Sequence, residues 1–134
     1  MLINDAATAI TKKFENMFLS ARKVFRNTKG DPSAIKSPFV RLVITFGAGK
    51  HIGWRGNEKL IEKLGEINFE IFTIFGKGDK YLTIIADQLG DEFSIKEFGC
   101  IQTLVDDGPW PLGEINGFDQ AKMSVPFTVK NLTE

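Results

Sequence analysis

The chain has 134 residues, 43% of them hydrophobic and 25% charged, and 17 lysines and arginines balance 17 aspartates and glutamates to a formal net charge of zero. This length indicates one domain, residues 1–134, with a single core. Zero net charge argues against binding of nucleic acid or an anionic membrane through overall charge, and it favours self-association. The single cysteine, Cys100, excludes an internal disulfide and a cysteine-based metal site.

The sequence shows no signal for a membrane or for export. No apolar run is as long as a membrane span, and the start, MLINDAATAI, lacks the basic and then apolar pattern of a signal peptide. A single cysteine also suits a reducing compartment. We therefore expect a protein made in the cytoplasm, without a membrane partner.

The first half of the chain predicts one helix and a long β-hairpin. Apolar residues at helical spacing predict a helix over 4–22, then a short edge strand at 24–25 and a loop over 27–38. Alternating apolar residues predict a strand over 39–46 and the central strand over 58–75, with a bulge or bend at Gly65. The glycine-rich stretch 47–57 would be the projecting tip of this hairpin, and a turn at 76–79 would end the central strand and cap the next helix.

The second half predicts a helix over 79–91, a strand within 95–105, a loop over 106–117 and a last strand over 118–129. Pro126 removes a backbone donor, so we expect the last strand at an edge or with an unpaired segment there. Together the elements predict an α+β fold: an antiparallel sheet with two helices packed on one face and a long projecting β-hairpin arm.

The residues suggest no catalytic site, metal or cofactor. The run 47–50, GAGK, has Ile44 where a phosphate loop needs glycine, His51 where it needs serine or threonine, and a strand after it instead of a helix. His51 is the only histidine, and no carboxylate stands near it in the sequence to orient it as a base. The acidic pairs at 91–92 and 106–107 are typical of solvated strands and turns.

Two segments carry residue types that favour a protein interface. Tryptophan and arginine are enriched at the energetic centres of interfaces, and the hairpin tip combines both with basic residues. A second tryptophan stands between two prolines, which stiffen the backbone around it. The alternative is that each tryptophan folds back onto its own core. The candidate interface residues are Lys50, His51, Trp54, Arg55 and Lys59 in the hairpin arm and Trp110 in the second segment.

In the order of these features the whole chain resembles the tail-terminator, or tail-completion, proteins of long-tailed bacteriophages. The resemblance begins with the amphipathic N-terminal helix and continues along the whole chain. The matching segments are Phe39–Leu42, Gly53–Gly56 at the hairpin tip, Phe72–Gly78, the helix Tyr81–Leu89 and the closing strand segment Met123–Phe127.

This resemblance implies a structural virion protein without catalytic residues. Such proteins form a ring, usually a hexamer, at the head-proximal end of the tail tube, where they stop tube polymerisation and join the head. The implied partners are further copies, the tail-tube protein and the head–tail connector protein, and duplex DNA passes through the lumen without sequence readout. We expect the hairpin, residues 44–60, to reach a neighbouring subunit or the tube, with Lys50, Arg55 and Lys59 toward a phosphate backbone or an acidic partner.

Other classes of protein remain as alternatives. One is another head–tail connector or minor tail protein. A small α+β enzyme or ligand-binding domain would need polar groups that converge on a pocket, and the sequence shows none. A nucleic-acid-binding module would need a basic face and would bind with strong salt dependence.

Overall fold

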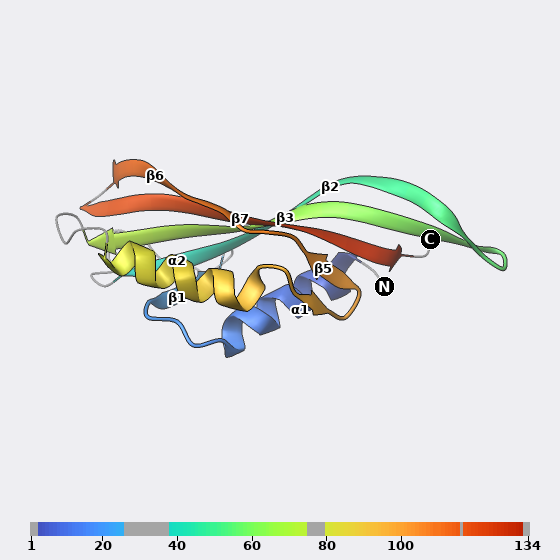
Figure 1. Ribbon diagram of the computed structural model, residues 1–134, viewed down its shortest axis with the longest axis horizontal. Helices are drawn as coiled ribbons and strands as arrows, with labels where there is room; N and C mark the ends of the chain where they lie inside the picture. Colours follow the sequence, from blue (N-terminus) through green and yellow to red (C-terminus); the bar gives the residue numbers. More distant parts are fainter. Residues whose placement is uncertain (1–2, 26–37, 75–79, 116, 133–134) are drawn as a thin grey trace.

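The computed structural model describes residues 3–25, 38–74, 80–115 and 117–132, and it is a mixed α+β fold with a curled open sheet and two helices (Figure 1). The predicted turn at 76–79 and the predicted loop at 27–38, apart from Pro38, lie outside these residues. None of the helices described is long and apolar enough to cross a membrane. The elements are α1 (Ile3–Asn16), β1 (Arg22–Phe25), β2 (Phe39–Arg55), β3 (Glu58–Ile74), α2 (Lys80–Phe93), β4 (Glu97–Phe98), β5 (Ile101–Thr103), β6 (Asp107–Ile115) and β7 (Phe118–Leu132).

The sheet has the strand order β1-β2-β3-β7-β5-β4, and β6 also pairs with β7. As the alternation predicts, β3 is central, between the antiparallel strands β2 and β7. The prediction of a wholly antiparallel sheet is wrong at β1, which pairs with β2 in parallel. A parallel pair needs a connection of about a dozen residues, and segment 26–38 supplies that length between Phe25 and Phe39.

One core cluster combines side chains of both helices with side chains of the three long strands. Side chains that alternate inward along the three long strands pack with the apolar stripes of both helices, and Figure 1 draws both helices below the sheet. The cluster is built on Ala6, Ile10 and Phe14 of α1, on Ile85, Leu89 and Phe93 of α2, and on Leu42, Ile67, Phe69, Ile71, Met123, Val125 and Phe127 of the strands. A smaller buried cluster of Phe39, Phe72 and Phe118 occupies the opposite face.

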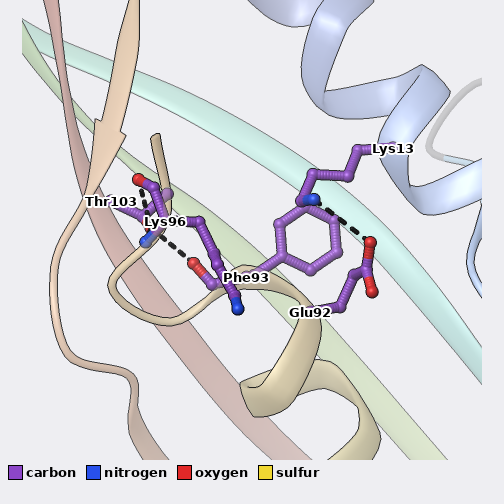
Figure 2. Close-up of polar contacts among 5 residues, drawn as sticks. All are labelled: Lys13, Glu92, Phe93, Lys96 and Thr103. Atoms are coloured by element: carbon purple, nitrogen blue, oxygen red, sulfur yellow. Dashed lines mark hydrogen bonds and ion pairs between the residues drawn. The ribbon is translucent and has the colours of Figure 1, made fainter. Parts of the chain in front are cut away.

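Polar contacts hold α2 to its neighbours, as Figure 2 shows. Lys13 Nζ of α1 lies 3.1 Å from Glu92 Oε1 of α2, and also 5.1 Å from the centroid of the Phe98 ring. The Thr103 hydroxyl of β5 donates to the carbonyl of Phe93, the last residue of α2, and accepts a hydrogen bond from Lys96 N at 2.7 Å. These contacts fix the carboxyl end of α2 against α1 and β5.

The first helix ends earlier than its apolar periodicity predicts. α1 stops at Asn16 instead of residue 22, and Phe18 is 80% exposed. Lys23 Nζ donates hydrogen bonds to the carbonyl of Glu15, in the last turn of the helix, and to the carbonyl of Met17 just after it. The chain then turns into β1, Arg22–Phe25, which contains the short edge strand predicted at 24–25.

The predicted loop over 106–117 is mostly strand, because β6 pairs with β7 along Asp107–Ile115. Pro109 and Pro111 cannot donate to a ladder, but β6 lies on an edge, where missing donors are tolerated. The strand predicted within 95–105 is split into β4 and β5.

The prediction that Pro126 places the last strand at an edge is wrong, since β7 lies between β3 and the strands β5 and β6. The alternative of an unpaired segment is confirmed on the β5–β6 side. There the ladder passes from Phe127, opposite Thr103, to Ser124, opposite Asp107, and Pro126 falls in the gap. The Pro126 carbonyl points into this gap and accepts from Leu104 N at 2.8 Å.

Candidate assembly interface

The glycine-rich stretch 47–57 is strand for most of its length, although its composition predicts a loop. β2 continues to Arg55, and only Gly56 and Asn57 form the turn to β3. Gly56 has φ 63°, and glycine is the residue that a type II′ hairpin turn requires at this first central position. The candidate residues of the hairpin therefore stand on the two faces of a paired ribbon.

Two bulges lie in β2, and the first begins at the pair of Phe46 with Gly65, where the sequence predicts a bulge or bend. The register shifts between Phe46 and Gly49 and again between His51 and Gly53, so that β2 carries the extra residues. Gly65 itself pairs with Phe46 on one side and with Phe127 on the other. A Cβ there would lie 2.7 Å from the carbonyl oxygen of Thr45 and 2.8 Å from Cε1 of Phe127, so the position has no room for a side chain.

The first patch, the Trp54 surface, consists of the exposed His51, Trp54 and Lys59 and the half-buried Ile61, which also packs against the core. Trp54 pairs with Lys59 and His51 pairs with Ile61, so all four share one face of the ribbon. The ring centroids of His51 and Trp54 are 5.2 Å apart in an edge-on contact. Trp54 is 58% exposed, which shows that its ring does not cover the core of its own chain.

The second patch is a hollow of about 380 Å³, which we call the Leu64 groove. Leu64 and Leu104 are 53% and 50% exposed on its walls, and Gly65 and Phe127 also border it. This groove is not among the predicted sites, although the sequence holds one signal of it: Leu64 stands in the polar register of β3, between Glu62 and Glu66. The lining residues are Thr45, Phe46, Gly47, Leu64, Gly65, Glu66, Leu104, Pro126 and Phe127.

The structure places the two tryptophans far apart. Trp110 of β6 pairs with Lys122, which in turn pairs with Glu70 of β3, whereas Trp54 pairs with Lys59 of the same strand. At about 3.3 Å per residue, the stretch of β3 from Lys59 to Glu70 is about 36 Å long. Trp110 is 42% exposed and its neighbour Leu112 is 54% exposed, so this part of β6 forms a separate apolar patch.

The other candidate residues lie along the hairpin without forming one cluster. Lys50 is exposed and pairs with Glu62, on the face opposite the Trp54 surface. The backbone of Arg55 pairs with that of Glu58 at the hairpin end, which lies at the right of Figure 1. Within the described ranges, no three His, Cys, Asp or Glu side chains lie close enough together to hold a metal ion.

The hairpin also exposes strand edges. β1 covers β2 only from Phe39 to Leu42, and none of the described strands pairs with the rest of that edge, Val43–Arg55. On the other side, the last residue of β3 that pairs with β7 is Ile61. Such edges are templates for pairing with another chain, and the two bulges limit this pairing because they twist the edge.

In comparisons with known proteins, no family model matches the sequence, and no curated protein matches it.

Proposed function

We propose that this chain is a tail terminator of a long-tailed bacteriophage, a structural virion protein and not an enzyme. It forms a ring, a hexamer, at the head-proximal end of the tail tube, ends tube polymerisation and offers the surface that joins the head. In this proposal the two helices cover one face of the sheet, and the β2–β3 hairpin projects as an arm toward a neighbour. Its partners are further copies, the tail-tube protein and the head–tail connector protein. Duplex DNA passes through the lumen of the ring without sequence-specific recognition.

One observation carries the proposal: the far end of the β2–β3 hairpin combines exposed aromatic and aliphatic side chains with unpaired strand edges. Trp54 is 58% exposed and Ile52 is 43% exposed, and both lie in the part of the hairpin beyond Ile61, where β7 no longer pairs with β3. Large exposed apolar groups next to open edges mark sites of protein association. The neutral net charge of the chain supports association with copies of itself. The order of sequence features, which resembles the tail terminators, selects the class of assembly.

The test is assembly of the purified chain, alone and with tail-tube protein of the phage whose genes adjoin its own. Light scattering gives the mass of the particle, and negative-stain microscopy shows rings and capped tube ends. We expect rings at the tube ends and tubes that no longer elongate. Trp54→Ala weakens this capping, whereas Phe18→Ala, which removes an aromatic ring that is 80% exposed away from the hairpin, leaves it unchanged.

Other outcomes separate the competing classes of protein. A chain that stays monomeric at high concentration, with tubes present, contradicts the proposal. A chain that forms rings without capping tubes is another head–tail connector or minor tail protein. Retention on duplex DNA that falls steeply with salt would identify a nucleic-acid-binding module, because released counterions make such binding salt-dependent.

A further inference from the structure

The two exposed patches of the hairpin lie on opposite faces of β3. β3 has no inserted residue between Lys59 and Leu64, since the extra residues are in β2 and β7. Successive side chains of a strand point to opposite sides. Leu64 comes five residues after Lys59, and because five is an odd number the two side chains point to opposite sides. Trp54 lies across from Lys59 and therefore also points away from Leu64.

The two faces differ in charge. Around the Trp54 surface, β3 contributes Lys59 and Lys63, both on the side of Ile61. The other side carries Glu62, Leu64 and Glu66. Lys50 lies opposite Glu62, but the neighbours of Glu66 across its two ladders are Thr45 and Pro126, so no cation opposes the Glu66 carboxylate in register. One face is apolar and basic, and the other is apolar and acidic.

These faces are complementary between copies and not within one chain. Because they point in opposite directions, a copy bound to one face does not reach the other, which excludes a two-fold dimer that uses both. A copy that uses both faces then holds two different neighbours, and such a heterologous contact gives a ring if the rotation between copies closes and an open filament if it does not. The hollow beside Leu64 is concave and apolar, and a large aromatic side chain contributes most when it is buried in such a site.

We infer that the Trp54 surface of one copy docks into the Leu64 groove of the next, with Lys59 of the first copy beside Glu66 of the second. This inference rests on the proposed function, because it names the interface that builds the proposed ring. The arm of each copy then lies over the sheet of its neighbour, and burial of Leu64, Leu104 and Trp54 removes three large side chains from water.

A mixing experiment tests the two-faced contact. Trp54→Glu breaks the first face and Leu104→Glu breaks the second, and both residues are at least half exposed, so the fold should tolerate them. Each variant alone should need a concentration about tenfold or more above that of the wild type to assemble. A one-to-one mixture should form dimers by light scattering, because each pair holds one intact junction. Variants that form rings alone, or a mixture that stays monomeric, would overturn the inference.

A charge exchange tests the pairing of Lys59 with Glu66. Lys59→Glu and Glu66→Lys each place like charges at the junction and should weaken assembly, and the double variant should restore it, because every junction regains opposite charges. Lys12→Glu, an exposed lysine on α1, is the matched control and should assemble as the wild type does. Circular dichroism establishes that each variant is folded. A double variant no better than the singles removes this pairing from the interface.

The failures of the two proposals are distinguishable. If the wild type caps tubes and all of these variants cap them equally well, the docking of Trp54 into the Leu64 groove is wrong and the terminator function stands. If the wild type stays monomeric with tubes present, both are wrong.

Discussion

Gly65 of β3 lies beneath the ring of Phe127, its partner on β7. Its partner on the other side is Phe46 of β2, and the ring centroids of Phe46 and Phe127 are 5.7 Å apart in an edge-on contact. The two rings thus come from strands that are not neighbours and meet over the one position of β3 that has no side chain. Phe127 belongs to the core cluster and Phe46 packs against it, and both residues also line the Leu64 groove.

Gly65→Ala should destabilise the fold by about 1–3 kcal/mol, because the added methyl group overpacks the space between the two neighbouring strands. A Cβ there would lie 2.8 Å from Cε1 of Phe127 and 2.7 Å from the oxygen of Thr45. Urea unfolding gives the change in free energy. Gly47→Ala is the control, since its nearest neighbour, the oxygen of Leu64, would be at an ordinary 3.5 Å. Equal stability of the two variants would mean that the rings move aside freely.

The strands β3 and β7 and the first half of β2, residues 39–46, were predictable, because one face of each is buried and the alternation of apolar residues records that face. β6 was not predictable from its composition. Asp107–Ile115 contains two prolines and two glycines, which are typical of a loop, and only the edge position makes them compatible with a strand. The parallel pairing of β1 depends on a contact with β2 that no local pattern records.

The candidate site was predictable in part. The sequence shows the tryptophan and the lysines of the hairpin. Their division between two faces depends on the bulges of β2, because each bulge shifts the register by one residue. The Leu64 groove brings Leu104 and Pro126 beside β3 from segments about 40 to 60 residues away along the chain, and such neighbours follow only from the strand order.

Ile95→Asn should stabilise the protein by about 0.5–1 kcal/mol. Ile95 has φ 53°, in the left-handed region that a β-branched residue rarely adopts and that asparagine tolerates. Its side chain is 70% exposed, so the loss of apolar burial is small. Thermal and urea unfolding measure the gain. Ile84→Asn, an exposed isoleucine within α2, is the control and should not stabilise, and the same change in both variants would show that backbone conformation is not the cause.

Lys13 and Glu92 should show a coupling energy of about 0.2–1 kcal/mol in a double-mutant cycle with Lys13→Met and Glu92→Gln. The 3.1 Å ion pair joins α1 to α2, but the side chains are 24% and 40% exposed, so solvent screens much of the attraction. Lys13→Met also removes the contacts of the ammonium with the rings of Phe93 and Phe98, and the cycle cancels this loss because both variants with Lys13→Met share it. The coupling should fall in about 1 M salt. A coupling that salt does not change would indicate packing instead of charge.

Ser124→Ala should cost about 1–3 kcal/mol, because it leaves a buried acceptor without its donor. Ser124 Oγ donates to Asn68 Oδ1 at 2.9 Å, and Asn68 Nδ2 donates to Thr45 Oγ1 at 3.4 Å, so a polar chain crosses β7, β3 and β2 on the face opposite the helices. Ser124 and Asn68 are only 5% and 7% exposed.

Ser20→Ala, which removes an exposed hydroxyl that accepts from Gln88, is the control and should cost less than about 0.5 kcal/mol. In urea unfolding, the double change Ser124→Ala with Asn68→Leu should cost less than the sum of the single changes, because the unpaired buried amide is then removed and the exposed Thr45 hydroxyl can bond to water. Strict additivity would show that water already satisfies Asn68.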